Sequence, residues 1–283
     1  MAGPDPAVSK RARTAIVATI ALYVAYGLLR LIPVLGPWSG VGLVAAFYFL
    51  PGWLLRQEPE VQARYQVGPD SPVPPWSWRG ALTALVAVVV VFPPFALLFW
   101  WFYAHVCAGD LRVLSPVLWA EAMTPWSGGL EKFLGSLCRG HQGGFWPDGV
   151  HLPPDWTSWV GSAWLGFDVA PNVLLVVAEG VFAVALAEEV FHRGYLMGAL
   201  EDRWPARRSV FGVKLGWGAV LSSLLFAVGH LVSMAQVARL ATFFPALLFA
   251  WLWRRSGSLW APALFHAAAN LLMDLLLKST FPP

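Results

Sequence analysis

Long apolar runs alternate with short polar segments along most of this chain. The apolar runs are continuous instead of strictly alternating, and this pattern favours helices over strands. Inside a bilayer every backbone N–H and C=O must be paired within the protein, which only helices and closed barrels achieve. We therefore expect an all-α polytopic membrane protein with about seven transmembrane helices. The predicted spans are residues 14–29, 41–55, 80–109, 172–200, 215–238, 240–253 and 258–277.

Composition supports this interpretation. Apolar residues make up 58% of the 283 residues and charged residues only 12%, about half of the roughly 25% typical of soluble domains. The mean hydropathy is +0.60. These values exclude a disordered chain, a disulfide-stapled miniprotein and an ordinary soluble enzyme. The net charge is only +3, and the sequence has no basic run interleaved with aromatics and no glycine-rich phosphate loop, so we expect no nucleic-acid partner.

The Lys and Arg residues orient the predicted spans. Basic residues concentrate in the cytoplasmic loops of membrane proteins. With the N-terminus in the cytoplasm, twelve Lys and Arg lie beside the spans on the cytoplasmic side and five on the outer side. We therefore expect a cytoplasmic N-terminus and an outer C-terminus. No small-x-small cleavage site follows the first apolar run, so we interpret it as an uncleaved span. The Ala-, Gly-, Pro-, Arg- and Trp-rich composition suggests a bacterial chain, and hence the bacterial inner (cytoplasmic) membrane.

Three regions follow from this layout. Residues 1–105 are N-terminal transmembrane helices, residues 106–170 are a Trp-rich extramembrane or interfacial loop, and residues 171–283 are the helical core that carries the chemistry. Trp prefers the boundary between lipid and water, so we expect part of the loop to lie on the membrane surface. Cys107 and Cys138 both lie in this loop; they either form a disulfide in an oxidising compartment or remain free thiols.

Ionisable groups within membrane spans are costly, so each one is a functional hypothesis. The sequence concentrates them in three short motifs on the fourth, fifth and seventh predicted spans. The motif residues are Glu188, Glu189 and Arg193; Phe226 and His230; and His266 and Asn270.

Helical spacing separates the roles of the two glutamates. Glu189 and Arg193 are four residues apart with the acid first, which is the favoured order for an ion pair. Glu188 points about 100° away around the helix, so we interpret it as the working acid, free to face a cavity. His266 and Asn270 share one helix face because they are also four residues apart.

The depth of these residues is compatible with a single site. At about 1.5 Å of rise per residue, Glu188, His230, His266 and Asn270 lie roughly 14 to 22 Å from the predicted cytoplasmic boundary. Phe226 lies one turn before His230 and is expected to pack beneath its imidazole. His192, one turn after Glu188, is either a local partner or a bystander, and we favour the bystander.

A carboxylate and an imidazole that meet in a wet intramembrane cavity suit general-base activation of water. A second His with an Asn supplies hydrogen-bond donors for a developing oxyanion. The same residue types allow an alternative with zinc, held by Glu188, His230 and His266. A proton-coupled transporter or a non-catalytic membrane scaffold are the alternatives from other functional classes, because buried Glu and His also serve proton relays.

Glu-Glu-x-x-x-Arg, Phe-x-x-x-His and His-x-x-x-Asn occur here in that order on apolar segments. Together they resemble the CAAX-protease and bacteriocin-processing family (CPBP, or Abi), a group of intramembrane endopeptidases that includes the type II CaaX prenyl endopeptidases. The resemblance covers about residues 172–277. It implies a CPBP-like catalytic helical core within the predicted membrane protein.

The resemblance also implies roles for the matching residues. Glu188 corresponds to the catalytic glutamate that activates water together with His230, and His266 and Asn270 to the pair that stabilises the oxyanion. Glu189 and Arg193 match the supporting positions. The expected mechanism is glutamic and needs no cofactor, with zinc as the alternative.

The substrate implied by the resemblance is a membrane-anchored protein or peptide in the lipid bilayer. The leading expectation is sorting-type processing of the C-terminal anchors of exported proteins, as in the myxosortase-like branch. CaaX-type prenyl endopeptidase activity and bacteriocin maturation or immunity are the alternatives within the family.

Overall fold

The first helix begins where local capping allows, which is earlier than its apolar run suggests. The computed structural model describes residues 5–68, 73–107 and 173–280. The first helix, α1 (Pro6–Arg30), starts eight residues before the predicted span because Asp5 caps it. The Asp5 carboxylate accepts a hydrogen bond from the Ala7 N–H at 2.9 Å, and proline occupies the first turn, where its missing N–H costs nothing.

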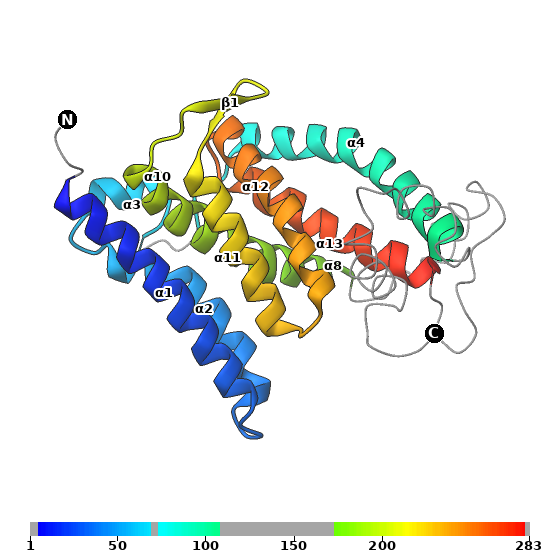
Figure 1. Cartoon of the computed structure of the whole chain (residues 1–283), viewed down its shortest axis with the longest axis horizontal. Coiled ribbons are helices and arrows are strands. Elements are labelled where there is room, and N and C mark those ends of the chain that lie inside the picture. The colour runs from blue at the N-terminus through cyan, green and yellow to red at the C-terminus, as the bar shows by residue number, and fades with distance from the viewer. Residues whose placement is uncertain (1–4, 69–72, 108–172, 281–283) are drawn as a thin grey trace, which may run out of the picture. The chain divides into compact units, whose positions relative to one another are not determined.

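The order of elements is mostly helical (Figure 1). After α1 come α2 (Gly36–Leu54), α3 (Pro59–Tyr65), α4 (Trp78–Trp101), η1 (Phe102–Cys107), α8 (Val173–Ala178), η4 (Glu179–Leu186), α9 (Ala187–Glu189), η5 (Val190–Met197), α10 (Gly198–Arg203), β1 (Arg208–Val210), β2 (Val213–Leu215), α11 (Trp217–Ser233), η6 (Val237–Thr242), α12 (Phe243–Ser256) and α13 (Trp260–Thr280).

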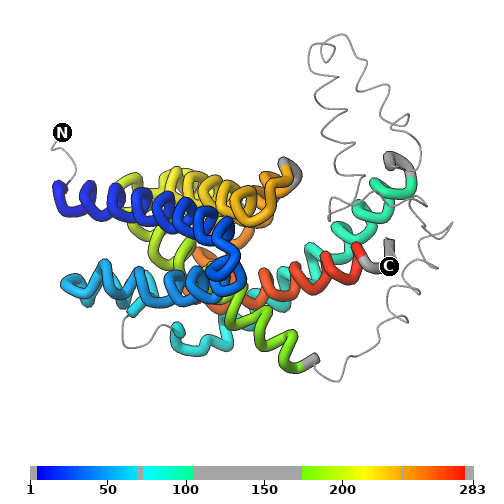
Figure 2. Tube along the Cα trace, turned by 90° about the horizontal axis from the view of Figure 1, so that it is seen from below, coloured from blue at the N-terminus to red at the C-terminus, as the bar shows by residue number. Residues whose placement is uncertain are grey.

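The chain forms two compact units. The first comprises Met1–Val86 and Leu174–Ala267, and the second comprises Ala87–Val173 and Ala268–Pro283. In the first unit α1 lies beside α2, and α11 lies beside α12 (Figure 1, Figure 2). In the second unit, Phe99, Tyr103 and Leu276 form a small buried cluster.

Three helices among the described residues are long and apolar enough to cross a membrane. They are Pro6–Arg30, Trp78–Ala104 and Trp260–Leu277, and Trp217–Ser233 is a shorter apolar helix. The expectation of a mostly helical chain with helices able to span a membrane is therefore confirmed, whereas the count of seven spans stays a prediction.

Several predicted boundaries differ from the observed helices. The second helix begins at Gly36, five residues before the predicted span, because Pro37 lies in its first turn, where proline is tolerated. The span predicted over 215–238 ends at Ser233, and α12 begins only at Phe243, after the short 3₁₀-helix η6. Most residues in this connection are also apolar, so the sequence pattern shows no break where the helix ends.

A small antiparallel hairpin, β1–β2, was not expected from an all-α pattern. Val210 pairs with Val213, and the two residues between them have positive φ angles, 48° at Phe211 and 76° at Gly212. Two consecutive positive φ values are typical of the two-residue hairpin turn that suits strand twist. The hairpin lies in the predicted cytoplasmic connection before α11.

The segment predicted as the fourth span is a continuous helical run from Val173 to Arg203. Two π-helical stretches, η4 and η5, flank the single α-turn of α9. Such stretches are rare and occur often at functional sites. All residues from Glu189 to Glu201 are buried, so this run forms the core of the first unit, against α1, α2 and α11.

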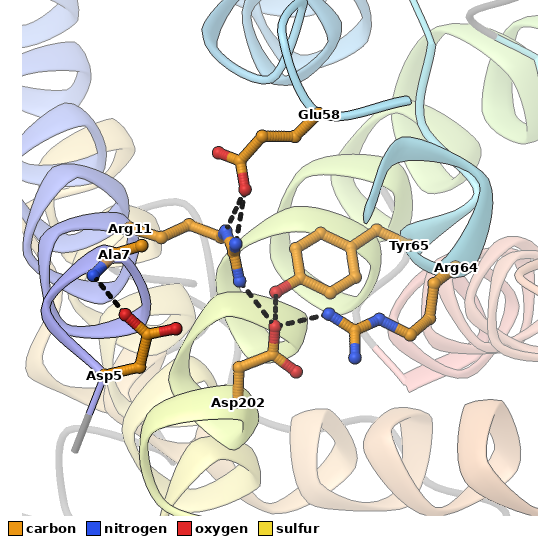
Figure 3. Close-up of polar contacts among 7 residues, drawn as sticks. All are labelled: Asp5, Ala7, Arg11, Glu58, Arg64, Tyr65 and Asp202. Atoms are coloured by element: carbon orange, nitrogen blue, oxygen red, sulfur yellow. Dashed lines mark hydrogen bonds and ion pairs between the residues drawn. The ribbon is translucent and has the colours of Figure 1, made fainter. Parts of the chain in front are cut away.

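Charged residues at one end of the first unit form a network around Asp202 (Figure 3). Its carboxylate oxygen Oδ2 accepts hydrogen bonds from Arg11 at 2.8 Å, Arg64 at 2.6 Å and the Tyr65 hydroxyl at 2.6 Å. Arg11 also pairs with Glu58. Burial, together with the bond to Asp202, raises the pKa of the Tyr65 phenol well above its usual range. The network joins α1, α3 and α10 at the base of the core.

Candidate active site

A buried ion pair forms the centre of the candidate site. Arg193 Nε lies 3.2 Å from Glu189 Oε2, and both side chains are fully buried. The predicted pairing of these two residues is thus confirmed, although the two atoms are not aligned as a hydrogen bond. Arg193 Nη2 donates to the backbone carbonyl of Ala246 on α12 at 3.0 Å. The pair therefore links the helical run 173–203 to α12.

Two aromatic rings complete the surroundings of Arg193. Its guanidinium carbon lies 4.7 Å from the ring centre of Phe226 and 5.3 Å from that of Phe249. Cation–π contacts of this kind contribute most where water is excluded. They reduce the cost of burying the guanidinium between three helices.

His266 lies between the two glutamates. Its Nδ1 is 3.1 Å from Glu189 Oε1, and its Nε2 is 3.8 Å from Glu188 Oε2. The Phe249 ring stacks on the imidazole with centroids 4.6 Å apart and an angle of 22° between the planes. A carboxylate accepts, so Nδ1–H donates to Glu189, and the other ring nitrogen faces Glu188. Glu189 therefore does more than pair with Arg193, which helical spacing alone did not reveal.

Glu188 differs from Glu189 in its access to the surroundings. The side chain of Glu188 is 20% exposed, whereas that of Glu189 is 0% exposed. Among the described residues, Glu188 Oε2 accepts no hydrogen bond. This difference agrees with the orientation inferred from helical spacing, in which Glu188 faces away from the ion pair.

His230 lies on α11 and is partly exposed. Its Nδ1 is 3.1 Å from the Phe226 carbonyl oxygen. A carbonyl can only accept, so Nδ1–H must donate, and the neutral ring keeps its lone pair on Nε2. The Phe226 ring lies 4.4 Å from the imidazole, which confirms that this phenylalanine packs against His230.

Phe226 contacts all three histidines of the region. Its ring centroid lies 5.0 Å from His192, 4.4 Å from His230 and 5.8 Å from His266. With Arg193 on its face as well, this 2%-exposed side chain holds the polar groups at fixed separations. Sequence spacing predicted only the contact with His230.

Two further polar residues belong to the region: Tyr23, which the sequence did not single out, and His192. Tyr23 on α1 places its hydroxyl 2.6 Å from His192 Nε2, and His192 Nδ1 lies 2.9 Å from the Glu188 carbonyl oxygen. Interpreting His192 as a bystander was therefore wrong, because it is buried and bonded at both nitrogens. A tyrosine within an apolar span is a signal for such a partner, since a buried hydroxyl needs one.

Asn270 lies one helical turn after His266 on α13 and belongs to the second unit, where it is exposed. Its role beside His266 stays a prediction. Cys138 and most of the Trp-rich loop fall outside the described residues, so the disulfide and the interfacial loop also stay predictions.

The zinc alternative can be compared with the donor geometry. Within the parts of the chain that the structure describes, no three His, Cys, Asp or Glu side chains converge to hold a metal ion. Glu188 and His266 approach each other, but His266 directs Nδ1 to Glu189. The side chains of Glu188, His230 and His266 thus do not form a zinc ligand set in this arrangement.

Part of the chain matches a known protein family. Residues 170–272 match the family model for type II CAAX prenyl endopeptidase Rce1-like proteins. Neither a curated protein nor a solved structure matches this chain. The matched segment contains all three motifs, from Glu188 to Asn270. Over this segment, the comparison confirms the resemblance to the CPBP family of intramembrane proteases that the three motifs indicate.

Proposed function

We propose that this protein is an intramembrane endopeptidase that cleaves a peptide bond in a membrane-anchored protein by glutamate-activated water. The observation that carries the proposal is the unequal environment of the paired acids. Glu189 is fully buried against Arg193 and His266, whereas Glu188 is partly exposed. The Glu189 carboxylate thereby has a structural role, and the Glu188 carboxylate is free to bind a water molecule.

In the proposed reaction Glu188 removes a proton from water, and the hydroxide attacks the substrate carbonyl carbon. His230 assists through Nε2, because its Nδ1–H is donated to the Phe226 carbonyl. The proton then passes to the amide nitrogen as the C–N bond breaks, which yields a carboxylic acid and an amine. This is general acid–base catalysis without a covalent intermediate.

His266 and Asn270 are proposed to stabilise the oxyanion. The hydrogen bond from His266 Nδ1–H to Glu189 orients the ring, so Nε2 points to the side of Glu188, and in the proposed step the imidazolium form donates from this nitrogen. Fixed donors at the position where negative charge develops lower the barrier because they need no reorganisation. Asn270 supplies an amide donor from the same helix face.

The proposed substrate is the membrane-anchored C-terminus of an exported protein in a bacterial inner membrane. The similarity to CAAX-type proteases supports a substrate held in the bilayer, and the sorting-type assignment rests on composition and the Trp-rich loop. CaaX-type prenyl proteins and bacteriocin precursors are the alternatives.

The experiment compares the membrane proteomes of cells that carry the wild-type protein and Glu188→Gln. Anchored precursors should accumulate in the variant, while immunoblotting shows equal amounts of inserted protein. Glu179→Gln is the matched control, since Glu179 lies on the same helical run and is exposed. Full processing by Glu188→Gln would remove the general-base role.

A further inference from the structure

Tyr23 lies at the meeting point of α1 with the two helices that carry the proposed general base and its histidine. Its hydroxyl is 2.6 Å from His192 Nε2, and its ring is 8% exposed. The partner His192 is on η5, four residues after Glu188. Both polar groups are thus buried in an apolar core, where an unpaired hydroxyl or imidazole is expensive.

The donor and acceptor in each of these hydrogen bonds can be assigned from the Glu188 carbonyl, where the series ends. His192 Nδ1 lies 2.9 Å from the Glu188 backbone carbonyl, which can only accept, so Nδ1–H donates. The neutral ring then presents a lone pair at Nε2, and the Tyr23 hydroxyl must be the donor there. A directed chain therefore runs from Tyr23 through His192 to the backbone of Glu188.

This chain ends in a part of the helix where regular bonding is interrupted. Glu188 lies in the single α-turn between the π-helical stretches η4 and η5. Backbone carbonyls next to a π-stretch have altered partners, so a side-chain donor can fix their direction. The His192 imidazole occupies this position, and its own orientation depends on the bond from Tyr23.

Tyr23 also touches the helix of His230. A Cβ atom on Gly229 would lie 2.1 Å from Tyr23 Cζ, so the tyrosine ring packs directly on the backbone that precedes His230. About two turns further along α1, Arg30 donates to the carbonyls of Val232 at 3.4 Å and of Ser233. These bonds hold α1 against the end of α11 and keep the Tyr23 ring in place.

We propose that Tyr23 is a positioning residue that, through His192, fixes Glu188 relative to His230. This inference rests on the proposed function. The Tyr23 hydroxyl bonds to His192, and His192 bonds to the backbone from which the reacting carboxylate projects. Its loss should therefore change the rate of the chemical step more than substrate binding.

The test uses the full-length protein in proteoliposomes with a processed substrate identified by the proteomic comparison. Tyr23→Phe removes only the hydroxyl. Loss of one buried hydrogen bond should lower kcat about five- to tenfold, with KM within about twofold. Tyr26→Phe is the matched control, because it makes the same change one turn along α1 at a half-buried site, and it should leave both constants unchanged.

A double-variant comparison tests whether the effect passes through His192. In a His192→Phe background, Tyr23→Phe should lower kcat less than about twofold, because the bond is already absent. His192→Gln keeps one acceptor and one donor and should retain more activity than His192→Phe. If His192→Phe fails to insert, the His192→Gln background serves instead, and there Tyr23→Phe should still lower kcat.

Two results would overturn the inference: wild-type kcat in Tyr23→Phe, or an undiminished effect of Tyr23→Phe in the His192→Phe background. Glu188→Gln is measured in parallel. An active Glu188→Gln protein would defeat the proposed function itself, whereas an inactive one beside an unaffected Tyr23→Phe would defeat only the positioning role.

Discussion

The imidazole of His266 and the carboxylate of Glu189 form a buried hydrogen bond, with Nδ1 3.1 Å from Oε1, across 77 residues of sequence. The same carboxylate lies 3.2 Å from Arg193. One acid thus connects the buried guanidinium to the imidazole of another helix. This arrangement gives the two neighbouring glutamates different environments, in line with a structural role for Glu189 and the reactive role proposed for Glu188, and each role can be tested by an isosteric change.

Glu189→Gln should destabilise the protein far more than Glu188→Gln. Removal of the Glu189 charge leaves the fully buried Arg193 without its counter-ion, which costs about 3–5 kcal/mol. Glu188 is 20% exposed, so its substitution should alter the stability by less than about 1 kcal/mol while abolishing cleavage. Thermal unfolding in detergent measures the first effect and a cleavage assay the second. Equal melting temperatures for the two variants would contradict the division of roles.

Phe226→Leu should impair cleavage without preventing insertion. The change keeps an apolar side chain but removes the ring that separates His192, His230 and His266. We expect at least a tenfold loss of kcat and about 1–2 kcal/mol of lost stability. Phe244→Leu on α12 is the control, since that side chain is 70% exposed. A normal rate in Phe226→Leu would show that the ring does not hold the histidines in position.

The network around Asp202 should respond unequally to loss of its two arginines. The Arg11 side chain is 10% exposed and that of Arg64 is 57% exposed. Exposed ion pairs contribute about 0–1 kcal/mol, so Arg64→Met should barely change the melting temperature. Arg11→Met should lower it clearly, because both Glu58 and Asp202 lose a largely buried partner. The opposite ranking in differential scanning fluorimetry would mean that the network does not anchor α1.

Metal dependence separates the glutamic proposal from the zinc alternative. Prolonged dialysis of the reconstituted protein against a chelator should leave its cleavage rate unchanged, because the proposed base is a carboxylate acting on free water. Metal analysis of the purified sample provides the independent measurement. Loss of activity with recovery on adding zinc would require Glu188, His230 and His266 to rearrange into a ligand set.

The site was predictable as a set of residues but only partly as a set of contacts. Glu189 and Arg193 could be paired from sequence because both lie within one helical turn, and Phe226 could be placed against His230 for the same reason. The bonds from His266 to Glu189 and from Tyr23 to His192 join different helices. Their formation depends on how those helices pack, which spacing along one helix does not reveal.

Some features of the fold were missed for the same reason. The π-helical stretches around Glu188 do not give apolar residues a regular helical spacing in the sequence. The strands beside Phe211 and Gly212 are too short to show an alternation of apolar and polar residues. The early start of α1 could have been found, because Asp5 before Pro6 is an ordinary capping signal.

By itself, the sequence determined that this chain suits a membrane and which few polar residues lie on its apolar helices. Both depend only on neighbouring residues in the chain: on the free energy of transferring consecutive side chains from water to lipid, and on the helical repeat. Only the tertiary structure decided which of those residues meet. Glu189 bonds to His266, the Glu188 side chain stays partly exposed, and Tyr23 bonds to His192. These contacts depend on close packing between helices, which sets distances that the geometry of one helix does not determine.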